Sequence, residues 1–138
     1  MMIYNIGIQK MIFNLESVIE QADANISNHL KKNNINISIF AMQWMNCLFT
    51  RDLPLYCVWR LWDSYLSNDG GFDLLHIFFS AALICRSGAE LMKANNEELL
   101  RFFSVLKPAS PYGWSYEEIG TLLSQAYVLQ SVFSSSIK

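Results

Sequence analysis

The sequence predicts an all-α fold, and three observations support this prediction. Apolar residues recur every three or four positions through most of the 138-residue chain, which is the spacing of a buried helical face. No stretch of useful length alternates apolar and polar residues, as a half-buried strand would. Asn95 with Glu98, and Ser115 with Glu118, have the spacing of a capping box, which opens a helix. The length suits a single domain with a real core.

The first predicted helix covers residues 8–32 and is broken near residues 22–25. Its apolar stripe keeps a three-four rhythm at Ile8, Met11, Ile12, Leu15, Val18, Ile19, Ala22, Ile26 and Leu30. Two asparagines at 33–34 end it, because asparagine favours turns and helix ends. His29 has no ligand partner four residues further on, so we expect it to interact with the C-terminal end of the helix dipole.

The stretch 40–63 predicts two helices joined by a short charged turn, around which the rest of the chain is organised. Helical spacing is kept at Ile37, Phe40, Trp44 and Leu48, and again at Leu55, Val58, Leu61, Trp62 and Tyr65. Pro54 has no N–H group and suits the first turn of the second helix. Asp52 is placed to accept hydrogen bonds from the free N–H groups there. Trp44 and Trp62 are expected in the core because indoles bury a large apolar area.

The second half of the chain predicts a central helix followed by shorter ones. Residues 72–86 are apolar almost all round, which is typical of a helix buried on most sides, and His76 is expected to be a hydrogen-bonded core residue. One further helical turn is predicted at 89–93. A short helix is predicted to begin after Asn95, and a longer last helix after Ser115. The last helix has a buried stripe at Ile119, Leu122, Leu123, Ala126, Leu129 and Phe133, before a fraying tail of serines.

Composition excludes several classes of function. The net charge is −2 and there is no long basic run, so we expect no nucleic-acid partner. The three cysteines lie within apolar helical patterns at spacings that fit no zinc motif, which predicts reduced, buried thiols and no metal or other cofactor. The longest apolar run is shorter than the roughly 20 residues that span a bilayer, so no transmembrane segment is expected.

The central stretch also has a recognisable residue order. Its motif positions are Trp44, Leu48 and Phe49, then Asp52, Leu53 and Pro54, then Arg60, Trp62 and Asp63. This order resembles the TBC domain, the helical domain of GTPase-activating proteins for Rab-type small GTPases. The flanks agree at 7–9 (Gly-Ile-Gln), at 71–72 (Gly-Phe) and at 114–120, where Trp-Ser-Tyr-Glu-Glu-Ile-Gly opens the last helix.

The resemblance covers essentially all of residues 1–138 but corresponds to only the C-terminal half of a TBC domain. It implies an orthogonal array of helices, forming the C-terminal subdomain of that domain. The family's catalytic motifs, Ile-x-x-Asp-x-x-Arg and Tyr-x-Gln-Gly, belong to the other half and do not occur here. We therefore expect a regulator of a GTPase rather than an enzyme, with no catalytic residue of its own, inactive as an isolated fragment.

The resemblance also assigns roles to individual residues. Trp44, Phe49, Leu53, Pro54, Arg60, Trp62 and Asp63 match positions expected to be structural. Within this set, Arg60 is expected to pair with a carboxylate, and Asp63 to accept bonds from an arginine or an indole N–H. Arg51 and Asp52, in the turn, are the candidates for contact with a bound GTPase, because turns on a rigid scaffold often carry binding residues.

Two functions of different class remain open. In the first, the chain supports Rab-GTPase activation in a longer parent protein, in the cytoplasm and peripheral to endomembranes through its GTP-bound partner. In the second, it is a non-catalytic helical interaction module. The apolar fraction is 52% and the charged fraction 16%, against about 45–50% and 25% in typical domains. We therefore expect self-association, partial disorder of residues 1–33, or binding of the missing half.

Overall fold

The computed structural model describes the backbone of residues 2–137 and the side chains of residues 7–135 and 137. This part of the chain contains helices and no strand, so the predicted all-α class is confirmed. The elements are α1 (Met2–Ala22), α2 (Ala24–Lys32), α3 (Ile37–Cys47), α4 (Leu55–Ser67), α5 (Phe72–Arg86), α6 (Gly88–Lys93), α7 (Asn96–Ser104), α8 (Tyr116–Phe133) and the 3-10 helix η1 (Ser134–Ser136).

The long N-terminal helix is broken where the sequence predicts. Asp23 has extended backbone (φ −154°, ψ 90°), and its side chain caps α2 by accepting from the N–H groups of Asn25 and Ile26. Asn34 ends α2 in the left-handed region, at φ 60°, which asparagine tolerates better than most residues. A short polar side chain at each end thus sets the length of α2.

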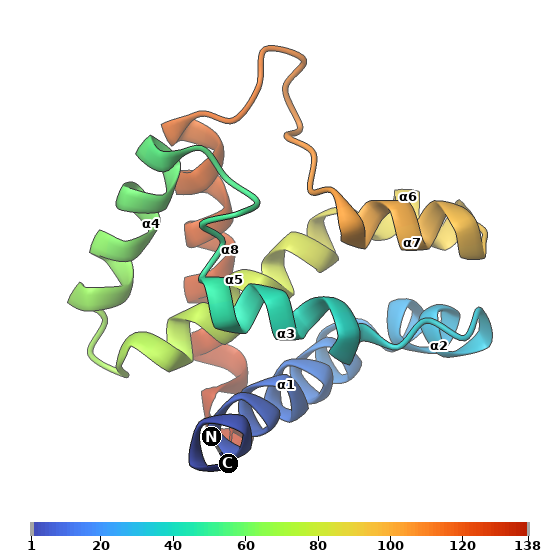
Figure 1. Ribbon diagram of the computed structural model, residues 1–138, viewed down its shortest axis with the longest axis horizontal. Helices are drawn as coiled ribbons and strands as arrows, with labels where there is room; N and C mark the ends of the chain where they lie inside the picture. Colours follow the sequence, from blue (N-terminus) through green and yellow to red (C-terminus); the bar gives the residue numbers. More distant parts are fainter. Residues whose placement is uncertain (1, 138) are drawn as a thin grey trace.

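Helix α5 is the centre of the array. Ten of its residues are buried, from Leu75 to Ile84 without interruption. It packs against α1, α4 and α8, and Figure 1 shows α8 crossing steeply behind α3 and α5. The expected orthogonal array with a central helix is therefore confirmed. Because α5 contacts neighbours on several sides, its sequence cannot be amphipathic and reads as apolar all round.

The two predicted capping boxes have different outcomes. At α7, the Asn95 side chain accepts from the Glu98 N–H (2.9 Å) and the Glu98 carboxylate accepts from the Asn95 N–H (3.2 Å), so both halves are present. At α8, Ser115 accepts from the Glu118 N–H at 3.2 Å, but the Glu118 carboxylate turns to other partners. The prediction of a second complete box was therefore wrong.

The C-terminal end also differs from its prediction. Residues 134–136 form the 3-10 helix η1 instead of an irregular tail. The last part of the α8 stripe, Leu129 and Phe133, is half-buried rather than buried, although both pack against the core. The stripe is thus covered fully only where α8 crosses α5.

Candidate functional site

The candidate site is the turn between α3 and α4, residues 48–54. Leu48 and Phe49 both lie in the left-handed region, at φ 51° and φ 67°. Non-glycine residues adopt this region rarely, at a cost of roughly 1–3 kcal/mol each, and such strain concentrates at functional sites. Two consecutive strained residues require strong restraint from the surrounding structure.

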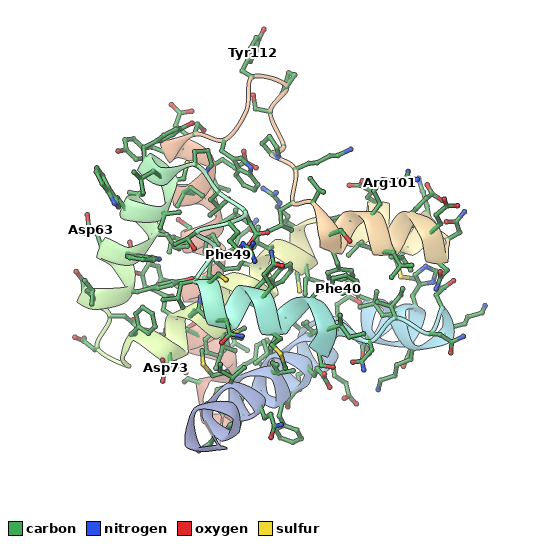
Figure 2. All side chains as sticks on the ribbon, in the orientation of Figure 1. Phe40, Phe49, Asp63, Asp73, Arg101 and Tyr112 are labelled. Atoms are coloured by element: carbon green, nitrogen blue, oxygen red, sulfur yellow. The ribbon has the colours of Figure 1, made fainter. Side chains whose placement is uncertain are left out.

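Phe49 supplies much of that restraint. Its side chain is fully buried, with its ring centroid 5.5 Å from Trp44, 5.4 Å from Phe79 and 5.3 Å from His76. Aromatic pairs at such distances stabilise beyond the area that they bury. The Phe49 carbonyl accepts from the N–H groups of Asp52 (3.1 Å) and Leu53 (3.0 Å), which closes the turn. Figure 2 shows Phe49 in the interior.

Trp62 restrains the first residue of the turn, Leu48. Its indole N–H donates to the Leu48 carbonyl at 3.1 Å, which joins α4 to the first left-handed residue. Trp62 is half-buried, whereas Trp44 is 1% exposed. The prediction of a buried core position was therefore wrong for Trp62, which packs against the core from a helix at the edge of the array (Figure 1) and is only partly covered.

A buried histidine ties three helices together behind the turn. The two ring nitrogens of His76 on α5 lie 2.7 Å from the Tyr65 hydroxyl (Nδ1) and 3.0 Å from the Trp44 carbonyl (Nε2). A carbonyl only accepts, so Nε2 carries the proton and Nδ1 accepts from Tyr65. Burial lowers the pKa of His76 to about 4, so the ring is neutral. His76 is thus the hydrogen-bonded core residue that the sequence predicts.

The two proposed contact residues lie on this turn in different environments. Arg51 is exposed. Asp52 is half-buried: its Oδ1 accepts from the Gln43 amide at 3.4 Å, its Oδ2 is buried with no hydrogen-bond partner among the described residues, and burial raises the pKa of its carboxyl. An incompletely paired carboxylate costs free energy that a partner could recover.

Asp52 does not cap α4 as predicted. The residue at the N-cap is Pro54, one position before the first helical residue, and no side chain caps this helix. The Pro54 carbonyl accepts from the N–H groups of Cys57 and Val58, both at 3.0 Å. Asp52 is too early in the turn to reach these groups, because the strained residues direct its side chain toward Gln43 on α3.

Two motif residues, Arg60 and Asp63, lack the contacts that were predicted for them. Arg60 donates to the Ser64 hydroxyl at 2.8 Å and pairs with no carboxylate among the described residues. Asp63 is exposed and lies on the outer side of α4, so its carboxylate accepts from neither an arginine nor an indole within the described chain (Figure 2). Leu53, another residue of the motif, is buried at 6% exposure, as a structural position would be.

A second polar cluster joins α5, the loop before α8 and α8 itself, and sequence reasoning missed it. Arg86 forms an ion pair with Glu118 Oε2, donates to the Lys107 carbonyl at 3.1 Å, and lies 5.3 Å from the centre of the Trp114 ring. Glu118 Oε2 also accepts from the Ala109 N–H at 2.7 Å. The Tyr56 hydroxyl donates to the Trp114 carbonyl. The signal in the sequence that could have indicated this cluster is Arg86, a single basic residue at the end of the apolar helix α5.

Other chemistry finds no support within the described residues. They include no group of three or more His, Cys, Asp or Glu side chains able to hold a metal ion. Cys47, Cys57 and Cys85 are all free thiols, although only Cys57 is fully buried. The described helices include none long and apolar enough to cross a membrane.

The architecture defines a class: an all-α array in which helices cross steeply around one central helix. The family model of the Rab-GTPase-TBC domain matches residues 1–92. The chain therefore belongs to the Rab-GTPase-TBC domain family.

Individual relatives cover nearly the whole chain. It is 35% identical over 128 residues to TBC1 domain family member 22B of Homo sapiens, covering 93% of this chain and 25% of that protein. It is 30% identical over 129 residues to the GTPase-activating protein gyp1 of Schizosaccharomyces pombe. That alignment covers 93% of this chain and 24% of gyp1. The crystal structure of the Ypt/Rab-GAP domain of Gyp1p matches with a TM-score of 0.83 and 31% identity, covering 92% of this chain and 38% of that one. The chain thus spans about a quarter of the length of these curated relatives.

Proposed function

We propose that this chain is the C-terminal half of a GTPase-activating domain for a Rab-type small GTPase, at the cytoplasmic face of endomembranes. The observation that carries the proposal is the match to the Ypt/Rab-GAP domain of Gyp1p over 92% of the chain. Small GTPases hydrolyse GTP slowly because the charge that develops on the phosphate oxygens is poorly compensated. An arginine supplied by the activator increases the rate by about 10³–10⁵.

We infer that none of the chain's own arginines supplies that charge. Arg60 and Arg86 donate hydrogen bonds within the fold, and Arg101 lies 3.8 Å from Glu97 on the same helix. Arg51 is exposed on a restrained turn, but no glutamine motif accompanies it in the sequence. We therefore assign this chain a supporting and partner-binding role, with the catalytic arginine and glutamine supplied by another part of the domain.

Single-turnover GTP hydrolysis tests the catalytic part of this proposal. With the chain in excess over a panel of Rab proteins, we expect less than about tenfold acceleration, which corresponds to less than about 1.4 kcal/mol of barrier. The Rab-GAP domain of Gyp1p serves as the positive control on the same panel. Acceleration beyond about tenfold would contradict the proposal and show that the chain contains catalytic groups of its own.

The turn 48–54 is proposed to contribute part of the GTPase-binding surface through Arg51 and Asp52. A turn held by Phe49 and Trp62 loses little conformational freedom on binding, which favours affinity. We expect Arg51→Ala to weaken binding to a GTP-loaded Rab protein by about three- to thirtyfold in a titration by calorimetry, since rim charges make modest contributions. Arg101→Ala is the control, because Arg101 is also a charged and exposed arginine but lies on α7 beside Glu97.

Equal affinities for the two variants and the unmodified chain would show that the turn is not part of the interface.

The alternative function, a non-catalytic interaction module, is favoured by the absence of both catalytic motifs of the family from the sequence. Nucleotide dependence separates the two functions. A supporting half of an activator should prefer the GTP-loaded over the GDP-loaded GTPase, whereas a general interaction module should show no such preference.

A further inference from the structure

The loop between α7 and α8 projects from the helical array. Residues 105–115 form no regular element, and the loop stands away from the helices in Figure 1. Tyr112 lies at its tip, 97% exposed, as Figure 2 shows. A loop of this length with no structure of its own is uncommon in a compact domain and is often functional.

Within this loop, Ser110 is the only serine or threonine of the sequence that proline follows. Proline has no N–H group, so it fits an apolar kinase pocket that offers no acceptor for the residue after the phosphorylated one. We propose that Ser110 is a phosphorylation site for a proline-directed serine/threonine kinase. This inference is independent of GTPase activation.

Ser110 is half-buried, and its hydrogen bonds to Tyr112 and Gly113 lie within the loop. Its hydroxyl accepts from the Tyr112 N–H at 3.1 Å, and its carbonyl accepts from the Gly113 N–H at 3.2 Å. Both bonds lie within one turn at the loop tip, where Gly113 provides the left-handed residue at φ 101°. A kinase can therefore extend residues 110–113 without unwinding a helix or exposing the core, at a cost of the two hydrogen bonds of this turn.

The chemistry needs one co-reactant, ATP bound by the kinase. The Ser110 Oγ attacks the γ-phosphorus, a new O–P bond forms, and the bond to the leaving ADP oxygen breaks. The hydroxyl proton passes to the catalytic aspartate of the kinase. The product carries about −1.5 to −2 charges at pH 7 on its phosphate group.

The surroundings of Ser110 indicate what the added charge would do. Ser110 lines an open cavity of about 320 Å³ together with Arg86, Ser115, Glu118, Thr121 and Gln125. Glu118 holds the base of the loop through Arg86 and through the N–H of Ala109, the neighbour of Ser110. A phosphate on Ser110 would repel Glu118 and compete with it for Arg86. We call these contacts of Glu118 with Arg86 and the Ala109 N–H the clamp between the loop, α5 and α8. Phosphorylation is thus expected to weaken the clamp.

The test uses the intact chain, Mg²⁺-ATP and a purified cyclin-dependent kinase, with phosphopeptides located by mass spectrometry. We expect one phosphate, on Ser110, none on this peptide in Ser110→Ala, and an initial rate at least tenfold lower for Pro111→Ala. Ser124→Ala, which changes an exposed serine not followed by proline, should retain the full rate. Circular dichroism confirms that each variant is folded, which is expected because the loop tip lies outside the core.

Three results would overturn the assignment: no incorporation while a Ser-Pro control peptide is phosphorylated, equal incorporation in Ser110→Ala, or an undiminished rate in Pro111→Ala.

The clamp is tested separately by thermal unfolding of the phosphorylated and unphosphorylated chains. Phosphorylation should lower the Tm of the unmodified chain more than that of Glu118→Gln, which lacks the repelling charge. Equal shifts, or no shift, would refute the competition for Arg86.

Discussion

At the scale of single residues, buried polar side chains set the geometry of the candidate site. His76 uses both ring nitrogens, one toward Tyr65 on α4 and one toward the Trp44 carbonyl on α3. A buried polar network whose members are all satisfied fixes the relative positions of its elements, because every displacement leaves a group unpaired. The turn that carries Arg51 is thus positioned by a histidine on another helix.

The neutral state of His76 makes stability dependent on pH. Its pKa is about 4 in the folded chain against about 6.5 when unfolded, so the unfolded chain binds more protons between these values. The free energy of unfolding should therefore fall by on the order of 3 kcal/mol as the pH decreases from about 6.5 to 4, with no further contribution below. Urea unfolding at a series of pH values measures this loss.

Direct titration of the imidazole identifies the group responsible. In an NMR titration of the folded chain, the His76 resonance should remain that of neutral imidazole down to about pH 5, with the resonance of His29, the second histidine, followed in the same spectra. If His76 titrates near 6.5 while the chain is still folded, its ring is not buried and bonded as described.

At the scale of elements, α4 is connected to the rest by unequal contacts. Its inner side carries Cys57, Val58, Leu61 and Tyr65, all buried. Its outer side carries Leu55, Trp59 and Leu66, at 62%, 60% and 77% exposure. Trp62 lies between the two sides and bonds the Leu48 carbonyl. The bond from this half-buried ring is therefore the link between α4 and the strained turn, in addition to the restraint from Phe49.

Replacing Trp62 by phenylalanine removes that hydrogen bond. The N–H donor is lost and the phenyl ring fills less space than the indole, so we expect Trp62→Phe to lower the free energy of unfolding by at least about 1 kcal/mol. Trp59→Phe is the matched control: Trp59 lies on the same helix, is mostly exposed, and should cost less than about 0.5 kcal/mol. Chemical denaturation of both variants gives the comparison. Equal losses would mean that the bond to Leu48 contributes nothing to the turn.

At the scale of the whole molecule, the core is closed around α5 while apolar side chains remain on several outer faces. The exposed large hydrophobic residues include Phe13, Ile39, Leu55, Trp59, Leu66, Val128 and Val132. Groups of such residues usually mark contact surfaces. The side chains of residues 1–6 lie outside the described ones, so the predicted disorder of residues 1–33 is partly untested, but α1 and α2 are helical from residue 2 onward.

We therefore predict that the chain self-associates, with the outer side of α4 as the contact. Light scattering should give a mass per particle that rises with concentration. Leu66→Lys should shift the chain toward monomer without loss of stability, whereas Val105→Lys, a comparably exposed position in the loop, should not. A chain that is monomeric at all accessible concentrations would contradict the prediction and show that these faces tolerate water.

The sequence by itself determined the features that depend on neighbours within about four residues. Apolar periodicity predicted the helices, the break after α1 and the burial of α5, and the Asn95–Glu98 spacing marked the start of α7. The residue order around Trp44 and Pro54 was enough to indicate the family. These signals are local because helix hydrogen bonds and caps join residues three or four apart.

Only the tertiary structure decided the features that depend on distant partners. Glu118 has the spacing of a capping box, but α5 brings Arg86 to it from 32 positions away, and a charged partner binds a carboxylate more strongly than a backbone N–H. Trp62 is less buried than predicted, and Asp63 lacks the predicted arginine or indole donor among the described residues, because α4 lies at the edge of the array. The left-handed conformation of Leu48 and Phe49 has no local signal, since neither residue favours it. It persists because buried rings and the indole of Trp62 restrain the turn.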